Sequence, residues 1–174
     1  MPKGAKLVLW SWDTAHKKGQ ANDPTAVLVV AETKNAFYLV DCVCRKMEFP
    51  ELKKEVKMRY GSKRASWVLV EDKASGQDLI PELKADTTMP VKAVKVDKDK
   101  VARVNYVIGG LEAGNWYLPE GAGWVADFVD ECAAFPNGDH DDRVDAWSQA
   151  ATFLKDRKGG PMITVHEWGD EVED

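Results

Sequence analysis

The sequence contains few cysteines and no long hydrophobic run, and each shortage excludes a class of protein. Three cysteines among 174 residues cannot form a fully paired disulfide framework. Cys42 and Cys44 lie two apart in an apolar run with no second cysteine pair or paired histidines nearby, so we expect buried free thiols rather than a zinc site. No apolar stretch approaches the roughly 18 residues of a membrane span, and the first residues lack a signal peptide's apolar region. These shortages predict a cytosolic protein that is not secreted.

Basic residues are not in excess, and several catalytic motifs are missing. The formal charge of −5 provides no overall basic surface for nucleic acid, so contact with DNA would need local lysines and bound cations. The motifs GxxxxGK[ST], GxGxxG and GxSxG are absent, which excludes a P-loop, a dinucleotide fingerprint and a nucleophile elbow. The only histidines, His16, His140 and His166, give weak support to a nucleophile–histidine triad.

The residues that are present indicate one α/β domain. With 44% hydrophobic residues and seven tryptophans, the chain can bury a proper core. Apolar and β-branched runs predict strands over 5–13, 25–32, 36–43, 65–71 and 90–96, with a short extended piece at 115–119. Apolar residues at helical spacing predict helices over 49–61, 75–86, 97–114, 124–135 and 141–155. The pattern predicts an antiparallel hairpin followed by parallel βαβ units, within a domain of residues 1–157, and a peripheral or disordered acidic tail over 158–174.

Two of the predicted helices have apolar faces that we expect to be buried. In the helix over 97–114, Asp97 or Asp99 is expected to cap the start. The face of that helix comprises Val101, Val104, Ile108 and Leu111. The face of the helix over 124–135 comprises Trp124, Phe128, Val129 and Cys132. We also expect Gly61 to end the first helix.

Acidic residues recur at the ends of apolar elements. Asp13 follows the first strand, and Glu71 ends the strand over 65–71. If these strands are parallel neighbours, both side chains lie at the same edge of the sheet, where α/β proteins form their sites. Asp141, Asp142 and Asp145 stand at the front of the last helix, at spacings that place Asp145 beside the other two.

Each acid taken singly also has a structural explanation. Asp13 could be a turn residue, Glu71 a solvated strand end, and Asp141 or Asp142 a helix cap favoured by the helix dipole. Together, however, acids from three segments repel one another unless they are protonated or neutralised by a cation. Hard oxygen ligands suit Mg²⁺ or Mn²⁺. An EF-hand is excluded, because neither aspartate-rich stretch has the glycine and glutamate that its calcium loop requires.

The chain resembles a known family over nearly its whole length in five motifs, taken in order: SWDTAHKKGQANDPTAV, WVLVEDKASGQDLIPEL, VDKDKVAR, LEAGNWYLP and FVDECAAFPNGDHDDRVDAW. This series is similar to the C-terminal nuclease domain of the large terminase subunit of tailed phages. The resemblance implies an RNase H-like fold, in which antiparallel leading strands precede parallel ones in a mixed sheet flanked by helices. It also implies an endonuclease that cuts concatemeric viral DNA during genome packaging.

By the same resemblance, the acids bind two divalent ions, Mg²⁺ or Mn²⁺. Asp13 corresponds to the first-strand aspartate, Glu71 to the acid after the later strand, and the aspartates of HDD to the C-terminal ligands. Between these two we prefer Asp142 as the shared ligand, with Asp141 close behind and Asp145 as an extra ligand or orienter. His140 is expected beside the acids, handling protons. The family's upstream ATPase domain is not represented, since a Walker motif is absent, so the chain resembles an excised or stand-alone nuclease domain.

The mechanism we expect is metal-assisted hydrolysis of double-stranded DNA that leaves a 3′-hydroxyl and a 5′-phosphate. The predicted phosphate contacts are Lys17, Lys18, Lys73, Lys100 and Arg103. The resemblance implies the ATPase domain, the portal and the small terminase subunit as partners, in the host cytoplasm. Two alternatives remain open, which are another RNase H-like nuclease such as a junction resolvase, and a non-cleaving docking domain whose acids only stabilise the fold.

Overall fold

The computed structural model describes residues 1–14, 24–62, 65–73, 75–95 and 99–157. The described chain forms a six-stranded sheet in the order β5-β4-β1-β2-β3-β6. Its strands are β1 (Leu7–Asp13), β2 (Thr25–Glu32), β3 (Phe37–Arg45), β4 (Trp67–Glu71), β5 (Val91–Val94) and β6 (Trp116–Tyr117). The helices are α1 (Phe49–Ser62), α2 (Ser75–Asp86), α3 (Lys100–Glu112), α4 (Val125–Ala134) and α5 (Asp142–Arg157).

The strand directions confirm the predicted mixed sheet. The strand β2 runs antiparallel to both β1 and β3, and its register with β3 shifts between Val29 and Val30. The strand β4 runs parallel to β1, and β5 runs parallel to β4. Because β1 and β4 are parallel neighbours, the carboxyl ends of both lie at one edge of the sheet.

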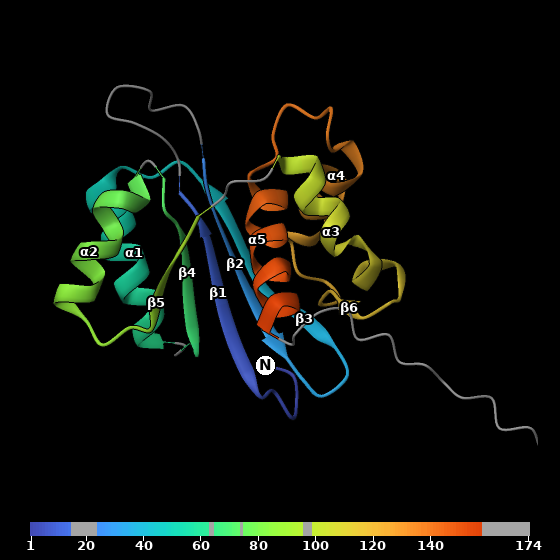
Figure 1. Ribbon diagram of the computed structural model, residues 1–174, viewed down its shortest axis with the longest axis horizontal. Helices are drawn as coiled ribbons and strands as arrows, with labels where there is room; N and C mark the ends of the chain where they lie inside the picture. The colour runs from blue at the N-terminus through green and yellow to red at the C-terminus, as the bar shows by residue number, and fades with distance from the viewer. Residues whose placement is uncertain (15–23, 63–64, 74, 96–98, 158–174) are drawn as a thin grey trace, which may run out of the picture.

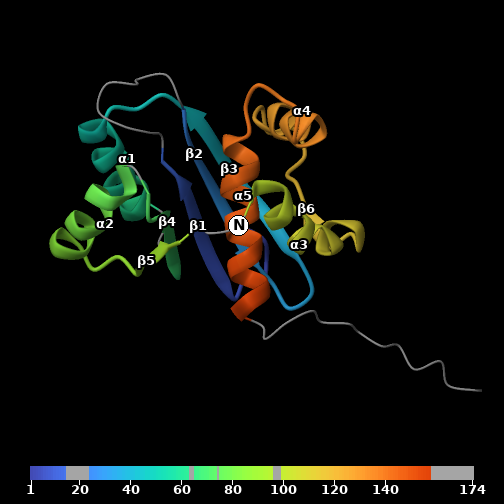
Figure 2. The same cartoon turned by 45° about the horizontal axis from the view of Figure 1, so that its top comes forward.

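Helices cover the two faces of the sheet unequally. Figures 1 and 2 show α1 and α2 on one side, beside β4 and β5, and α3, α4 and α5 on the other, with α5 crossing β1 and β2. Side chains alternate along β1, so Trp10 and Trp12 pack toward α1 and α2, whereas Leu7 and Leu9 pack against α5. The side chain of Trp12 is fully buried.

Some predicted boundaries and faces are wrong. The helix α1 continues through Gly61 to Ser62. Val101 and Leu111 of α3 are exposed, because α3 packs mainly against α5 near its middle, where Val104 and Val107 are buried. Val129 of α4 is also exposed.

Other local predictions are confirmed. Asp99 caps α3, since its carboxylate accepts hydrogen bonds from the backbone amides of Val101 at 3.0 Å and Ala102 at 3.3 Å. All three cysteines are free thiols, although only Cys42 is fully buried. None of the helices that the structure describes has the length and apolar character needed to span a bilayer. The predicted tail over 158–174 lies outside the described residues, so the proposed domain division stays a prediction.

Candidate metal centre

Asp13 and Glu71 lie together at the carboxyl edge of the sheet. The pairing of Trp12 with Val70 in the parallel β1–β4 ladder places the next residues, Asp13 and Glu71, at matching positions. Because side chains alternate along a strand, Asp13 points to the same face as Leu9, and Glu71 to the same face as Leu69. Leu9 and Leu69 both pack in the cluster that includes α5. The two carboxyls therefore face the side of the sheet on which α5 begins.

Gly76 holds the start of α2 close against Glu71. A Cβ atom at this position would lie 1.9 Å from the Glu71 carbonyl oxygen, closer than any side chain tolerates. The Gly76 amide donates to the Lys73 carbonyl at 3.0 Å, which closes a tight turn after β4. Glycine is therefore required at this position for the first turn of α2 to lie so close to the end of β4.

Helix α5 presents a polar face to Asp13. Asp142, Asp145 and Gln149 are spaced three and four residues apart, so they lie on one side of the helix. The Gln149 side-chain amide donates to the Ser11 hydroxyl at 2.9 Å and to the Trp12 carbonyl at 3.4 Å. Both bonds are buried and join α5 to the two residues of β1 that precede Asp13. They therefore fix the distance between this strand and the aspartates of the helix.

The start of α5 is held by a glutamate of α4. One carboxylate oxygen of Glu131 accepts from the backbone amides of Arg143 at 2.6 Å and Val144 at 3.1 Å, and the other accepts from the Arg143 guanidinium at 2.7 Å. Glu131 thereby caps amides that a helix cannot satisfy internally. The predicted capping by Asp141 or Asp142 side chains is not needed for these two amides, so both aspartates are available for other contacts.

Asp13 and Asp142 are harder to ionise than ordinary aspartates. Burial raises the pKa of Asp13 well above its usual value, and the hydrogen bond that its protonated carboxyl donates to Glu71, together with the charges of Glu71, Asp145 and Asp142, raises it further. Burial also raises the pKa of Asp142 to about 6, with the charges of Glu131 and Asp141 adding to the effect. A hydrogen bond between two carboxyl groups requires that one keeps its proton. In the metal-free site, the clustered carboxyl groups therefore cannot all be ionised unless cations neutralise their charge.

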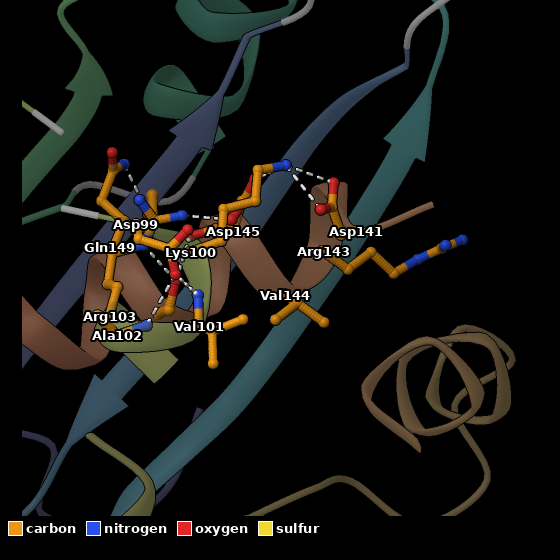
Figure 3. A network of polar contacts seen from close by, with 12 residues as sticks. Asp99, Lys100, Val101, Ala102, Arg103, Asp141, Arg143, Val144, Asp145 and Gln149 are labelled. Atoms are coloured by element: carbon orange, nitrogen blue, oxygen red, sulfur yellow. Dashed lines mark hydrogen bonds and ion pairs between the residues drawn. The ribbon is translucent and has the colours of Figure 1, made fainter. Parts of the chain in front are cut away.

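Two cations partly offset this charge. The Lys100 ammonium contacts both Asp141 oxygens, at 2.7 and 2.6 Å, and one Asp145 oxygen at 2.7 Å (Figure 3). The buried Arg103 guanidinium donates to the Ser148 hydroxyl at 2.8 Å and forms an ion pair with Asp145. Burial raises the pKa of Asp145, and these two cations work against that rise. Of the two aspartates in the HDD motif, Lys100 therefore contacts Asp141 and not Asp142.

The raised pKa of Asp142 predicts a pH-dependent stability. Its pKa is about 6 in the folded protein and about 4 in an unfolded chain, so the unfolding free energy that it contributes falls as pH rises between these values. The pKa of Asp13 is also raised, so its ionisation adds to this loss. We expect the melting temperature of the parent protein in EDTA to fall relative to Asp142→Asn as pH rises from about 4.5 to about 7. A melting difference that stays constant across this range would contradict the shift.

The donor set of the site fits a hard divalent cation. Asp13, Glu71 and Asp142 supply only carboxylate oxygens, which are the ligands that Mg²⁺ and Mn²⁺ prefer. In their present conformations, no three acidic, histidine or cysteine side chains of the described residues stand close enough together to hold an ion. The contacts explain this spacing, since Lys100 holds Asp141 and Asp145, and Asp13 bonds to Glu71. An ion would have to draw the carboxylates of Asp13, Glu71 and Asp142 together.

The remaining predicted site residues differ in how well their surroundings suit the predicted roles. Lys73 and His140 are exposed, in the turn after β4 and the loop before α5. The predicted phosphate contact at Arg103 meets an unsuitable environment, because its guanidinium is buried against Asp145 and Ser148. Lys17 and Lys18 lie outside the described residues.

Sequence reasoning missed three positioning residues. These are Glu131, Arg143 and Gln149. Glu131 and Arg143 pair with each other, and Gln149 bonds to Ser11, so every partner lies at least a dozen residues away in the sequence. One signal was available for Glu131, since it stands next to Cys132 on the otherwise apolar side of α4 that contains Phe128. A charged residue at such a position is buried only when it is paired.

Comparison with solved structures finds the same fold in viral terminases. The large terminase of a thermophilic bacteriophage aligns with a TM-score of 0.65 at 15% identity, over 88% of this chain and 41% of that one. The large terminase nuclease of the thermophilic phage G20c with bound magnesium aligns with a TM-score of 0.64 at 15% identity, over 84% and 80% of the two chains. The manganese-soaked, inhibitor-bound terminase nuclease domain of human cytomegalovirus aligns with a TM-score of 0.59 at 13% identity, over 86% and 83%.

At such identities, these structures show the RNase H-like fold alone. The chain spans 41% of the length of the first of them, the bacteriophage large terminase, so it corresponds to one part of that protein. No curated protein sequence matches the chain. The model of the terminase RNase H-like domain family, however, matches residues 10–152, which include all the acids of the site. The chain therefore belongs to the terminase RNase H-like domain family.

Proposed function

We propose that this chain is a divalent-metal-dependent endonuclease domain that cleaves double-stranded viral DNA during genome packaging. The observation that carries the proposal is the pairing of Asp13 with Glu71 at the carboxyl ends of β1 and β4, where burial, Glu71 and the charge of nearby Asp142 raise the pKa of Asp13. Family membership supports the nuclease assignment. The magnesium-bound nuclease of phage G20c supports the choice of ion.

Two ions of Mg²⁺ or Mn²⁺ are proposed, with Asp13 and Asp142 holding the first and Glu71 holding the second. Bound ions of this kind lower the pKa of a water and stabilise the leaving oxygen of a phosphodiester. The protein's own part is positioning. The β1–β4 ladder holds two of the carboxylates, and the buried Gln149 bonds hold α5, from which Asp142 projects. The expected products have a 5′-phosphate and a 3′-hydroxyl.

The DNA must approach an acidic edge, so local cations have to accompany it. Lys73 follows Glu71 by two residues and is exposed, which supports a phosphate contact there. We propose concatemeric viral DNA as the substrate in the host cytoplasm. The packaging ATPase domain, the portal and the small terminase subunit are the proposed partners, because the chain corresponds to one part of the longer bacteriophage large terminase.

A plasmid assay tests this function. We expect the protein to nick and linearise supercoiled plasmid with Mn²⁺ or Mg²⁺ and to be inactive in EDTA, because the acids cannot activate water without an ion. Glu71→Gln should reduce the rate by at least about 10²-fold, since one ligand becomes neutral. The products should accept a 5′ label from polynucleotide kinase only after phosphatase treatment.

The control is Glu112→Gln, which removes the same charge from an exposed position at the end of α3. It should cleave at the parent rate. If the parent does not cut under any of these conditions, the chain is a docking domain rather than a nuclease. If Glu71→Gln cuts as fast as the control, the cleavage does not depend on this site and the proposed function is wrong. Preference for four-way junctions over linear duplex would instead favour a resolvase.

A further inference from the structure

The Lys100 ammonium occupies the acidic cluster as a cation would. It is the first residue of α3, and the Asp99 cap fixes that end of the helix, so the long side chain starts from a held position. Its three contacts to Asp141 and Asp145 lie between 2.6 and 2.7 Å (Figure 3). Asp145 belongs to the first turn of α5, and Asp141 directly precedes that helix, 41 residues along the chain from Lys100. The contact is therefore a tertiary feature of the site.

We propose that Lys100 is the counter-cation of the metal-free site and competes with divalent ions for Asp141 and Asp145, the two carboxylates on either side of the proposed ligand Asp142 in the sequence. The proposal rests on the proposed metal binding at this acidic cluster. An ion that engages both oxygens of Asp141 must displace the ammonium, because each of them is already in contact with it. A tethered ammonium thus lowers the affinity of the site for metal and keeps the metal-free protein folded.

The two cations near α5 differ in how easily they can leave. Arg103 is buried, and Ser148 also accepts a hydrogen bond from its guanidinium, so it stays with Asp145. The Lys100 side chain is about half exposed, at 49%, on a flexible stem that can swing into solvent.

Competition predicts two effects of opposite sign for Lys100→Met. Without the ammonium, Asp141 loses its cation and the cluster gains one net negative charge, so the metal-free protein should melt about 2–4 °C lower in EDTA. The same charge attracts a divalent ion more strongly, and nothing has to be displaced. Affinity for Mn²⁺, measured by titration calorimetry, should therefore rise on the order of tenfold.

The matched control is Lys73→Met, which removes an exposed lysine beside Glu71 and changes the net charge equally. Its Mn²⁺ affinity should rise by less than about threefold, since only long-range charge changes. Lys100→Arg keeps the charge and should fold and bind Mn²⁺ within about threefold of the parent. Lys100→Met affinity that is weaker than the parent's, or no higher than that of Lys73→Met, would overturn the proposal and make Lys100 an organiser of the ligands. If Lys100→Met does not fold, Lys100→Gln, which also removes the charge but stays polar, replaces it, with the same comparison.

The competition by Lys100 and the nuclease activity are tested by different measurements. Calorimetry measures ion binding whether or not DNA is cut, so a parent that binds Mn²⁺ without cleaving plasmid would defeat only the nuclease assignment. A parent that cleaves, combined with unchanged affinity in Lys100→Met, would defeat only the competition.

Discussion

The Asp13→Asn variant is expected to lose DNA cleavage and yet to melt at a higher temperature in EDTA than the parent. Asparagine has nearly the same shape as aspartate but cannot ionise, so it removes a metal ligand and a repelling charge together. Loss of the ligand should lower the cleavage rate by at least about 10³-fold, or about 4 kcal/mol of transition-state stabilisation. The raised pKa of Asp13 shows that its ionised form is unfavourable in the folded protein, and this determines the sign of the stability change.

Added metal should reverse the order of the melting temperatures of the parent and Asp13→Asn. Added Mn²⁺ stabilises the parent because it binds only the folded state, and it should stabilise Asp13→Asn far less. The control is Asp130→Asn, an exposed aspartate of α4, which should change neither cleavage nor melting by more than small amounts. A lower melting temperature of Asp13→Asn in EDTA would mean that Asp13 serves the fold, as in the docking-domain alternative.

The sequence was sufficient to place the acids of the two strands. Asp13 and Glu71 each end a run of apolar residues long enough to be recognised as a strand, and the helical segments between strands imply parallel pairing. Parallel neighbours have their carboxyl ends on the same side of the sheet. Once the two strands and their parallel direction were assigned, Asp13 and Glu71 could be predicted to lie together. The register of β1 and β4 confirms that step.

The sequence could not show how the aspartates of α5 divide their contacts. Spacing treats Asp141 and Asp142 as equal neighbours at a helix start. Their difference arises from α3, which carries Lys100 to Asp141, and from burial beside Glu131, which raises the pKa of Asp142. Both effects depend on how helices pack across the sheet, and helical periodicity contains no information about that packing.

The same limit applies to the anchoring of α5. Glu131 has its side chain almost entirely buried, at 5% exposure, and satisfies two backbone amides and one guanidinium of the first turn of α5. The Arg143 Nε atom is buried without a partner among the described residues, so this arginine depends on Glu131 for its main contact. Asp127 offers Arg143 only a more distant contact, at 3.3 Å from an exposed side chain.

Replacing Glu131 with alanine should therefore destabilise the protein strongly. The change leaves a partly buried guanidinium with only the more distant Asp127 contact, and two helix amides without an acceptor, which together cost about 3–5 kcal/mol, or roughly 10 °C in melting temperature. Glu131→Gln should lose less, because its amide oxygen still accepts from the backbone. Mn²⁺ affinity should fall in both variants, since Asp142 begins the turn that Glu131 holds. Asp127→Ala removes the other acid near Arg143 and should cost less than about 1 kcal/mol. Equal losses in Asp127→Ala and Glu131→Ala, measured by denaturant unfolding, would show that Arg143 rather than the helix cap dominates the anchor.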